Sequence, residues 1–166
     1  MIIAVDFDGT LVDHVFPEIG EPVPGAFDWL KRFKEAGAIL ILYTMRADER
    51  GSKSVEMFPG ERKFLSEAVE FCRSHGVEFD ALNRNPTQDE WTSSPKAYAH
   101  VYIDDAAFGC PLNPPTNGGR CTVNWDVVGP AVLALIEKNE LEVIIAREKA
   151  AIEANRTPTV NPANGE

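Results

Sequence analysis

Cysteine is scarce in this chain of 166 residues, and basic residues are outnumbered by acidic ones. The three cysteines, Cys72, Cys110 and Cys121, are an odd number at uneven spacing, which argues against a disulfide framework and predicts a reduced, cytoplasmic protein. Sixteen lysines and arginines stand against 26 aspartates and glutamates, a formal net charge of -10. This balance disfavours nucleic acid as the main partner, because a phosphate backbone attracts basic surfaces.

Long apolar runs are also absent. The longest, Ala38–Leu42, is far too short to span a bilayer, so no membrane segment is expected. Met1 leads directly into an apolar stretch without a basic region before it, which predicts no signal peptide. The length fits one domain, expected over residues 1–154, and the aperiodic end at 155–166 is expected to be a disordered tail.

Apolar stretches alternate with amphipathic ones along the chain. The patterns predict strands at 2–5, 38–43, 77–79 and 100–103, and helices at 26–36, 61–74, 127–136 and 141–154. Asp126 is expected to cap the third helix, Trp125 to anchor the core beside it, and Pro111–Thr122 to form a loop. Strands that alternate with helices predict an α/β fold with a central parallel sheet, whose sites lie at the carboxyl ends of its strands.

The most informative segment is Asp6-Phe7-Asp8-Gly9-Thr10, directly after the first strand. Successive side chains of a strand alternate, so Asp6 and Asp8 are expected to point the same way. Gly9 permits a sharp turn after them. Two adjacent carboxylates repel each other and need a cation nearby. The segment therefore suits a carboxylate nucleophile with a second carboxyl group beside it, and it indicates phosphate chemistry.

Two later strands also end in polar residues. Thr44-Met45-Arg46 follows the second strand, and Asp104-Asp105 follows the last, with Lys96 a few residues ahead of it. In a parallel sheet these side chains converge at one rim. Carboxylates, a hydroxyl group and a lysine together suit phosphoryl transfer.

Four segments of the chain resemble, in order, the four signature motifs of the haloacid dehalogenase (HAD) superfamily of phosphohydrolases. They are Asp6-Phe7-Asp8-Gly9-Thr10, Thr44, Lys96 and Asp104-Asp105, and the resemblance covers about residues 2–110. The segments 6–24 and 102–109 are similar to small HAD-type hydrolases of bacteria and phages. The resemblance implies a Rossmann-like, three-layer α/β/α fold. The intervals between the motifs are too short for a sizeable cap domain, so it also implies an open, minimally capped enzyme.

The resemblance implies a role for each motif residue. Asp6 would attack phosphorus to form an aspartyl-phosphate, and Asp8 would act as the acid and then the base. Thr44 would bind the transferring phosphoryl group, and Lys96 would hold its charge. Mg²⁺ would be the cofactor.

The implied metal ligands are Asp6, the backbone carbonyl of Asp8, Asp104 and, directly or through water, Asp105. Hard oxygen ligands suit Mg²⁺. The function implied is that of a Mg²⁺-dependent phosphatase, a hydrolase of phosphomonoesters, acting on a phosphorylated substrate that the motifs do not identify.

Several alternatives stay open at this stage. The enzyme could be a nucleotide or nucleic-acid-end phosphatase, or the chain a non-catalytic phosphate- or metal-binding module. Arg46 could bind a substrate phosphate or carboxylate, and it could equally be an ordinary surface arginine. The three histidines are interpreted as structural. The apolar positions from Leu141 to Ile152 suit internal packing or a homo-oligomer surface. Substrate contacts are expected from the loops 15–24, 47–60 and 111–122.

Overall fold

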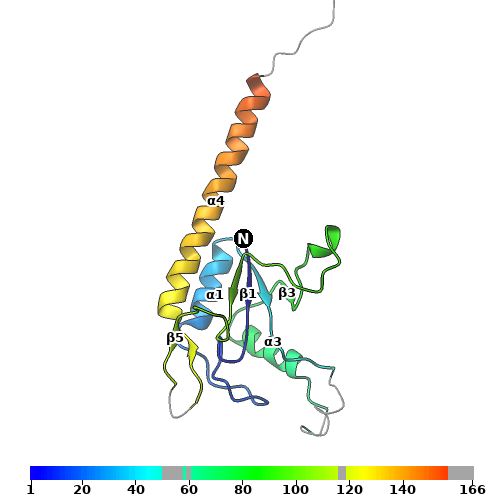
Figure 1. The fold of residues 1–166 in the computed structure, drawn as a ribbon, viewed down its shortest axis with the longest axis vertical. Helices are drawn as coiled ribbons and strands as arrows, with labels where there is room; N and C mark the ends of the chain where they lie inside the picture. Colours follow the sequence, from blue (N-terminus) through cyan, green and yellow to red (C-terminus); the bar gives the residue numbers. More distant parts are fainter. Residues whose placement is uncertain (50–57, 59–60, 116–118, 157–166) are drawn as a thin grey trace, which may run out of the picture.

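The fold is known from a computed structural model, which describes residues 1–49, 58, 61–115 and 119–156. Its centre is a parallel sheet of four strands in the order β3-β2-β1-β4 (Figure 1). The strands are β1 Ile2–Val5, β2 Ile39–Leu42, β3 Ala81–Leu82 and β4 Val101–Ile103. The predicted α/β fold with a parallel sheet is confirmed.

The register of the sheet brings its strand ends to one level. Val5, the last residue of β1, pairs with Leu42 of β2 and with Ile103 of β4. The pairing continues one step further, because the Asp6 amide donates to the Ile103 carbonyl at 2.9 Å. Polar residues that follow β1, β2 and β4 therefore emerge side by side at the carboxyl edge of the sheet.

Three helices pack on one face of the sheet. They are α1 Ala26–Glu35, α3 Phe64–Ser74 and α4 Trp125–Arg156, and each places an apolar stripe in the same core. In α1 that stripe consists of Phe27, Leu30 and Phe33. The strands contribute their alternate residues, such as Ile3 and Val5 of β1.

The opposite face of the sheet carries a second, smaller core. Ala4 and Ile41 pack there against Ala99, from the connection 83–100. The only helical turn of that connection is the 3-10 helix η1, Gln88–Glu90, and no α-helix of the described residues joins this core. Among the described residues, this face therefore lacks the helix layer that a three-layer arrangement would place there. Two prolines interrupt the connection, and the Gln88 side chain holds it as a loop by donating to the Ser94 and Lys96 carbonyls.

Some elements lie elsewhere than predicted. The strand expected at 77–79 is replaced by β3 at 81–82, because Val77 is buried in the main core and the Asp80 carboxylate accepts a bond from the Leu40 amide at 2.8 Å. The loop 111–122 contains β5, Leu112–Asn113, and its antiparallel partner β6, Thr122–Val123, begins at its end. Residues 116–118 between them lie outside the described part.

The helices expected at 127–136 and 141–154 are one continuous helix of 32 residues, α4. It begins at Trp125, so Asp126 lies in its first turn and is not its cap. Trp125 is buried, as predicted. Figure 1 shows that α4 runs beside α1 and then projects beyond the rest of the fold. The expected tail begins inside α4, which ends at Arg156, and its residues 157–166 lie outside the described part.

Within the described ranges, no helix combines the length and the apolar character needed to cross a membrane.

Candidate functional site

Three carboxylates meet at the carboxyl edge of the sheet. Asp6 directly follows β1, and Asp104 and Asp105 directly follow β4. One carboxylate oxygen of each lies within 4.8 Å of one from each of the others. The convergence predicted from the strand ends is therefore present in the structure for these three residues.

The electrostatics of this carboxylate cluster (Asp6, Asp104 and Asp105) reflect burial and mutual repulsion. Burial, above all, raises the pKa of Asp6 from 3.8 to about 7, and the charges of Asp104, Asp105 and Asp8 add to the effect. Burial and Asp104 also raise the pKa of Asp105. The cluster thus holds more negative charge than its own surroundings neutralise.

The turn after β1 is shaped to bring the two strand ends together. Gly9 has a φ of 83°, and a Cβ there would lie 2.6 Å from the Asp105 carboxylate. The Asp105 amide donates to Thr10 Oγ1 at 3.1 Å. The Trp125 indole donates to the Thr10 carbonyl at 2.8 Å, which fixes the turn to the start of α4. Gly9 and Thr10 therefore hold the Asp6 strand end against the Asp105 strand end.

Asp8 has a different environment, because it is fully paired. Arg46 Nε donates to one carboxylate oxygen of Asp8 at 2.8 Å, and Arg46 Nη2 donates to the other at 2.7 Å. The Arg46 side chain is 1 % exposed and that of Asp8 is 13 % exposed. Such a two-point ion pair is strong and geometrically specific.

Two further N–H groups of Arg46 also have partners. They bind the Pro17 and Glu18 carbonyls, at 3.2 Å from Nη1 and 2.8 Å from Nη2. The guanidinium carbon lies 5.0 Å from the Phe7 ring centroid and 5.1 Å from that of Phe16. In this conformation Arg46 holds Asp8 and the loop 16–18, and it also lines the cavity described below. Binding of a substrate anion by Arg46 stays a prediction.

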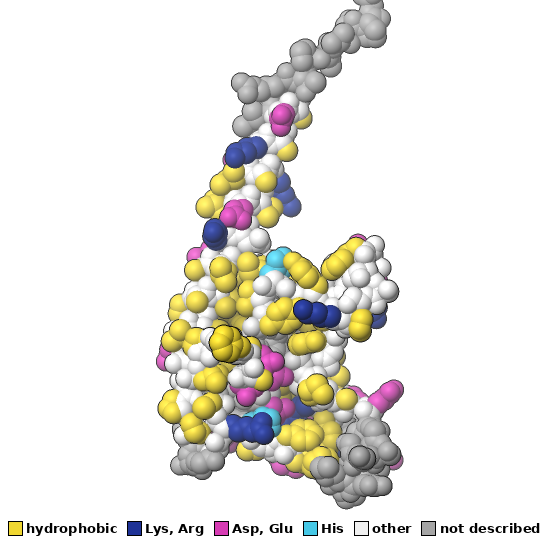
Figure 2. Space-filling view, in the orientation of Figure 1, with side chains coloured by type: hydrophobic (Ala, Val, Ile, Leu, Met, Phe, Trp, Pro, Cys, Tyr) yellow, Lys and Arg dark blue, Asp and Glu magenta, His cyan; other side chains and the backbone are white. Residues whose placement is uncertain are grey.

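A cavity of about 440 Å³ lies over these groups. Thr44 lines it, and its hydroxyl oxygen accepts a bond from the Arg46 amide at 3.2 Å. Figure 2 shows acidic side chains gathered near the centre of one face, beside histidine and basic side chains. The lining residues are Asp6, Asp8, His14, Phe16, Thr44, Met45, Arg46, Asp104, Asp105, Ala106 and Arg120.

Lys96, expected at this site, is not among those lining residues. It is exposed, and its backbone belongs to the connection that the Gln88 side chain holds. Two basic residues that sequence reasoning missed line the cavity instead, His14 and Arg120, and both partly offset the rise in the pKa of Asp105. His14 was interpreted as structural, and no motif marked Arg120, which the β5–β6 hairpin brings to the site.

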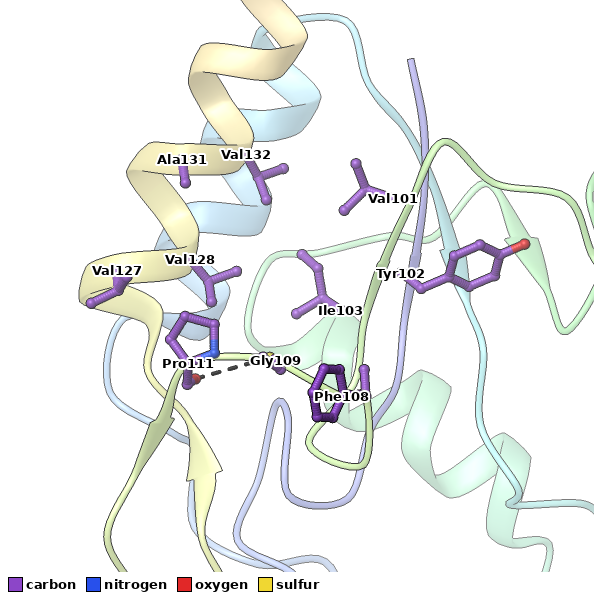
Figure 3. A pocket seen from close by; sticks show the side chains of 12 residues that line it. Val101, Tyr102, Ile103, Phe108, Gly109, Pro111, Val127, Val128, Ala131 and Val132 are labelled. Carbon is purple, nitrogen blue, oxygen red and sulfur yellow. Dashed lines mark hydrogen bonds between the residues drawn. The ribbon is translucent and has the colours of Figure 1, made fainter.

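A second cavity, of about 310 Å³, lies between β4 and α4 (Figure 3). Its lining is almost entirely apolar and includes Ile103, Phe108, Val128 and Val132. None of its lining residues is acidic or basic. It offers no carboxylate or cationic side chain for metal binding or charge stabilisation, so the acidic cavity is the candidate site.

The carboxylate cluster fits a hard divalent cation such as Mg²⁺. Its donors are all carboxylate oxygens, and they converge from two adjacent strand ends. The raised pKa of Asp6 agrees with this, because the neighbouring carboxylates repel its charge and a cation would offset that repulsion. Oxygen ligands of this kind, with water completing the shell, are what Mg²⁺ prefers.

Two of the loops expected to contact substrate contribute to the cavity wall. Phe16 comes from the loop 15–24 and Arg120 from the loop 111–122. Most of the loop 47–60 lies outside the described residues.

The chain matches no family model and no curated protein. A solved structure of a conserved protein from Bacteroides thetaiotaomicron is similar to it, with a TM-score of 0.56 and 32% sequence identity. The match covers 80% of this chain and 88% of that chain. At this identity and coverage, the chain belongs to the same family as the conserved Bacteroides thetaiotaomicron protein.

Proposed function

We propose that this protein is a Mg²⁺-dependent phosphomonoester hydrolase of the HAD type, which works through an aspartyl-phosphate on Asp6. The observation that carries the proposal is the meeting of Asp6 with Asp104 and Asp105 at the carboxyl edge of a parallel sheet. Thr44 lies in the wall of the same cavity. The order of these residues along the chain matches the motifs that the sequence resembles.

The nucleophile of this proposal is Asp6. One of its carboxylate oxygens forms a bond to phosphorus while the bond from phosphorus to the leaving oxygen breaks. Water then attacks the aspartyl-phosphate, which releases inorganic phosphate and restores the carboxylate. Bound Mg²⁺, held by Asp6, Asp104 and Asp105, would offset the repulsion between a carboxylate and a phosphate dianion.

Proton transfer is assigned to Asp8, which lines the same cavity. It would protonate the leaving oxygen and later accept a proton from the attacking water. Both of its carboxylate oxygens accept hydrogen bonds from Arg46. Arg46 therefore orients Asp8, and one of these bonds must lengthen or be shared when Asp8 carries a proton.

The charge on the transferring phosphoryl group would be stabilised from the cavity wall. The Thr44 hydroxyl is one donor, and its position is held by the Arg46 amide. Arg120 and His14 are the basic residues that line the cavity besides the paired Arg46. In this conformation they take the place that the resemblance assigns to Lys96.

The test is hydrolysis of an aryl phosphate, para-nitrophenyl phosphate, with Mg²⁺ and with a chelator. We expect phosphate release only with Mg²⁺, and a loss of at least about 10³-fold in the Asp6→Asn variant. Asp28→Asn is the matched control, because Asp28 is an exposed aspartate of α1 that does not line the cavity. An Asp6→Asn protein with undiminished turnover would exclude the mechanism.

The same measurements separate the alternatives. Binding of Mg²⁺ and inorganic phosphate without turnover of any phosphomonoester would indicate a non-catalytic binding module. A strong preference for phosphorylated oligonucleotide ends, with steep salt dependence, would indicate a nucleic-acid-end phosphatase.

A further inference from the structure

The projecting part of α4 exposes apolar side chains that the fold does not cover. The stripe of α4 that packs in the core ends at Ile136. Beyond it, Leu141, Val143, Ile144 and Ile145 are 40–57 % exposed. Figure 2 shows hydrophobic and charged side chains side by side on this projection. Helices of this length gain most of their stability from packing, so an uncovered apolar surface here indicates a missing partner.

Two of these residues, Leu141 and Ile145, belong to a regular stripe on the outer side of α4. Its members are Ala134, Lys138, Leu141, Ile145 and Glu148, all exposed. They alternate in steps of four and three residues, the spacing of a coiled-coil seam. Leu141 lies two and a half helical turns beyond the core residue Val132, and Ile145 lies equally far beyond the core residue Ile136. Half a turn reverses the side of a helix, so the outer stripe faces away from the core.

We propose that this outer stripe binds a second copy of the chain, with the two α4 helices antiparallel. In one register, Leu141 packs against the partner's Ile145, and Lys138 meets the partner's Glu148. Both pairs arise together, because the two residues of each pair are placed symmetrically about Val143. A two-fold axis that crosses the outer stripe midway between Leu141 and Ile145 makes each contact twice.

The charges on the stripe select this orientation. A parallel dimer in register would set Lys138 against the partner's Lys138 and Glu148 against the partner's Glu148. The antiparallel dimer replaces both repulsions with attractions. Among the described residues, the ion pair of Lys138 is a long contact of 4.0 Å with Glu142, and both side chains are largely exposed. The polar positions of the stripe therefore remain available to a partner.

The test is the oligomeric state of the full-length protein by analytical ultracentrifugation. We expect the wild type to dimerise and Ile145→Asp to be monomeric. Lys138→Glu and Glu148→Lys alone should each raise the dimer dissociation constant by about tenfold or more, because each introduces two like-charge contacts. The double variant should return to within about threefold of the wild type. Arg147→Glu is the matched control, an exposed charge reversal off the stripe.

Each outcome bears on the proposal. A monomeric wild type, or an Ile145→Asp protein that dimerises as well as the wild type, would overturn it. Single variants that dimerise normally, or a double variant no tighter than the single ones, would contradict the antiparallel register. Circular dichroism of every variant separates a lost interface from a lost helix. The interface is independent of phosphatase activity, so neither proposal depends on the other.

Discussion

Two groups of carboxylates line one cavity, and they differ in how their charge is balanced. Asp8 shares a two-point ion pair with Arg46, whose side chain is almost completely buried. The carboxylate cluster has no such partner: among the described residues, no ion pair joins it to a basic side chain. Instead its members repel one another, and burial raises the pKa of Asp6 to about 7.

This difference shows which negative charge is neutralised within the fold and which one is left for a ligand to neutralise. A buried charge is stable when it is paired and hydrogen-bonded, as Asp8 is. An unpaired group of half-buried carboxylates lowers stability until protons or a cation neutralise it. We infer that the Asp8–Arg46 pair holds the site in shape, whereas the carboxylate cluster is prepared for a cation.

The largest expected effect on stability comes from breaking the ion pair. Arg46→Met removes one partner of a buried pair and leaves the Asp8 carboxylate and two carbonyls without their donor. We expect a loss of about 3–5 kcal/mol in the free energy of unfolding, measured by urea denaturation. The double variant Arg46→Met, Asp8→Leu should recover most of that loss, because it leaves no unpaired charge.

A surface pair provides the control. Arg73 and Glu70 of α3 are in contact at 2.8 Å, and their side chains are 55 % and 70 % exposed. Arg73→Met should change stability by less than about 1 kcal/mol. Equal losses from Arg46→Met and Arg73→Met would show that the Asp8–Arg46 pair is not a structural element of the site.

The second prediction concerns the pH dependence of the carboxylate cluster. Folding raises the pKa of Asp6 from 3.8 to about 7, so the folded state retains a proton that the unfolded state loses. The contribution of Asp6 to the free energy of unfolding is therefore fully present below about pH 4. It is lost as the pH rises to about 7. The fall amounts to at most about 4 kcal/mol.

This dependence is measured as the difference between the wild type and Asp6→Asn, in a chelator, from pH 4 to pH 8. The free energy of unfolding of Asp6→Asn should increase relative to that of the wild type as the pH rises, because an amide does not ionise. A constant difference across that range would mean that the carboxylate cluster is not strained.

The third prediction is that Mg²⁺ removes this strain. A cation that binds only the folded state at a concentration of 100 times its dissociation constant adds about 2.7 kcal/mol to stability. We expect Mg²⁺ to raise the melting temperature of the wild type, and to do so much less for Asp104→Asn. Arg46→Lys should keep a Mg²⁺ response, since it leaves the carboxylate cluster intact. A response of Asp104→Asn equal to that of the wild type would argue against the metal site.

The carboxylate cluster could be predicted from the sequence because each member adjoins a strand. Asp6 and Asp104 directly follow apolar strands, and parallel pairing puts their ends at one level. The same reasoning could not foresee the partner of Asp8. Arg46 also follows a strand, but whether a guanidinium faces solvent or turns inward depends on the packing of Phe16 and on carbonyls of the loop 16–18.

The fold was predicted where periodicity is strong and missed where tertiary contacts decide. The strands β1 and β2 and the helix α1 follow from apolar patterns. The position of β3 depends on the Asp80 carboxylate and on the burial of Val77, neither of which leaves a periodic signal. The connection that packs on the second face of the sheet is held by side chains of Gln88, Asn85 and Tyr102, which no periodic pattern marks.

The smallest expected effect distinguishes two candidates for the cation that faces the phosphate. Arg120 lines the cavity and lowers the pKa of Asp105, whereas Lys96 is exposed and lies outside the cavity lining. Arg120→Met should raise KM for an aryl phosphate about fivefold, about 1 kcal/mol, and Lys96→Met should leave kcat/KM within about twofold. Steady-state kinetics with saturating Mg²⁺ measure both. If Lys96→Met loses more activity than Arg120→Met, then the connection 83–100 must move when substrate binds. Lys96, and not Arg120, would then be the cation that faces the phosphate.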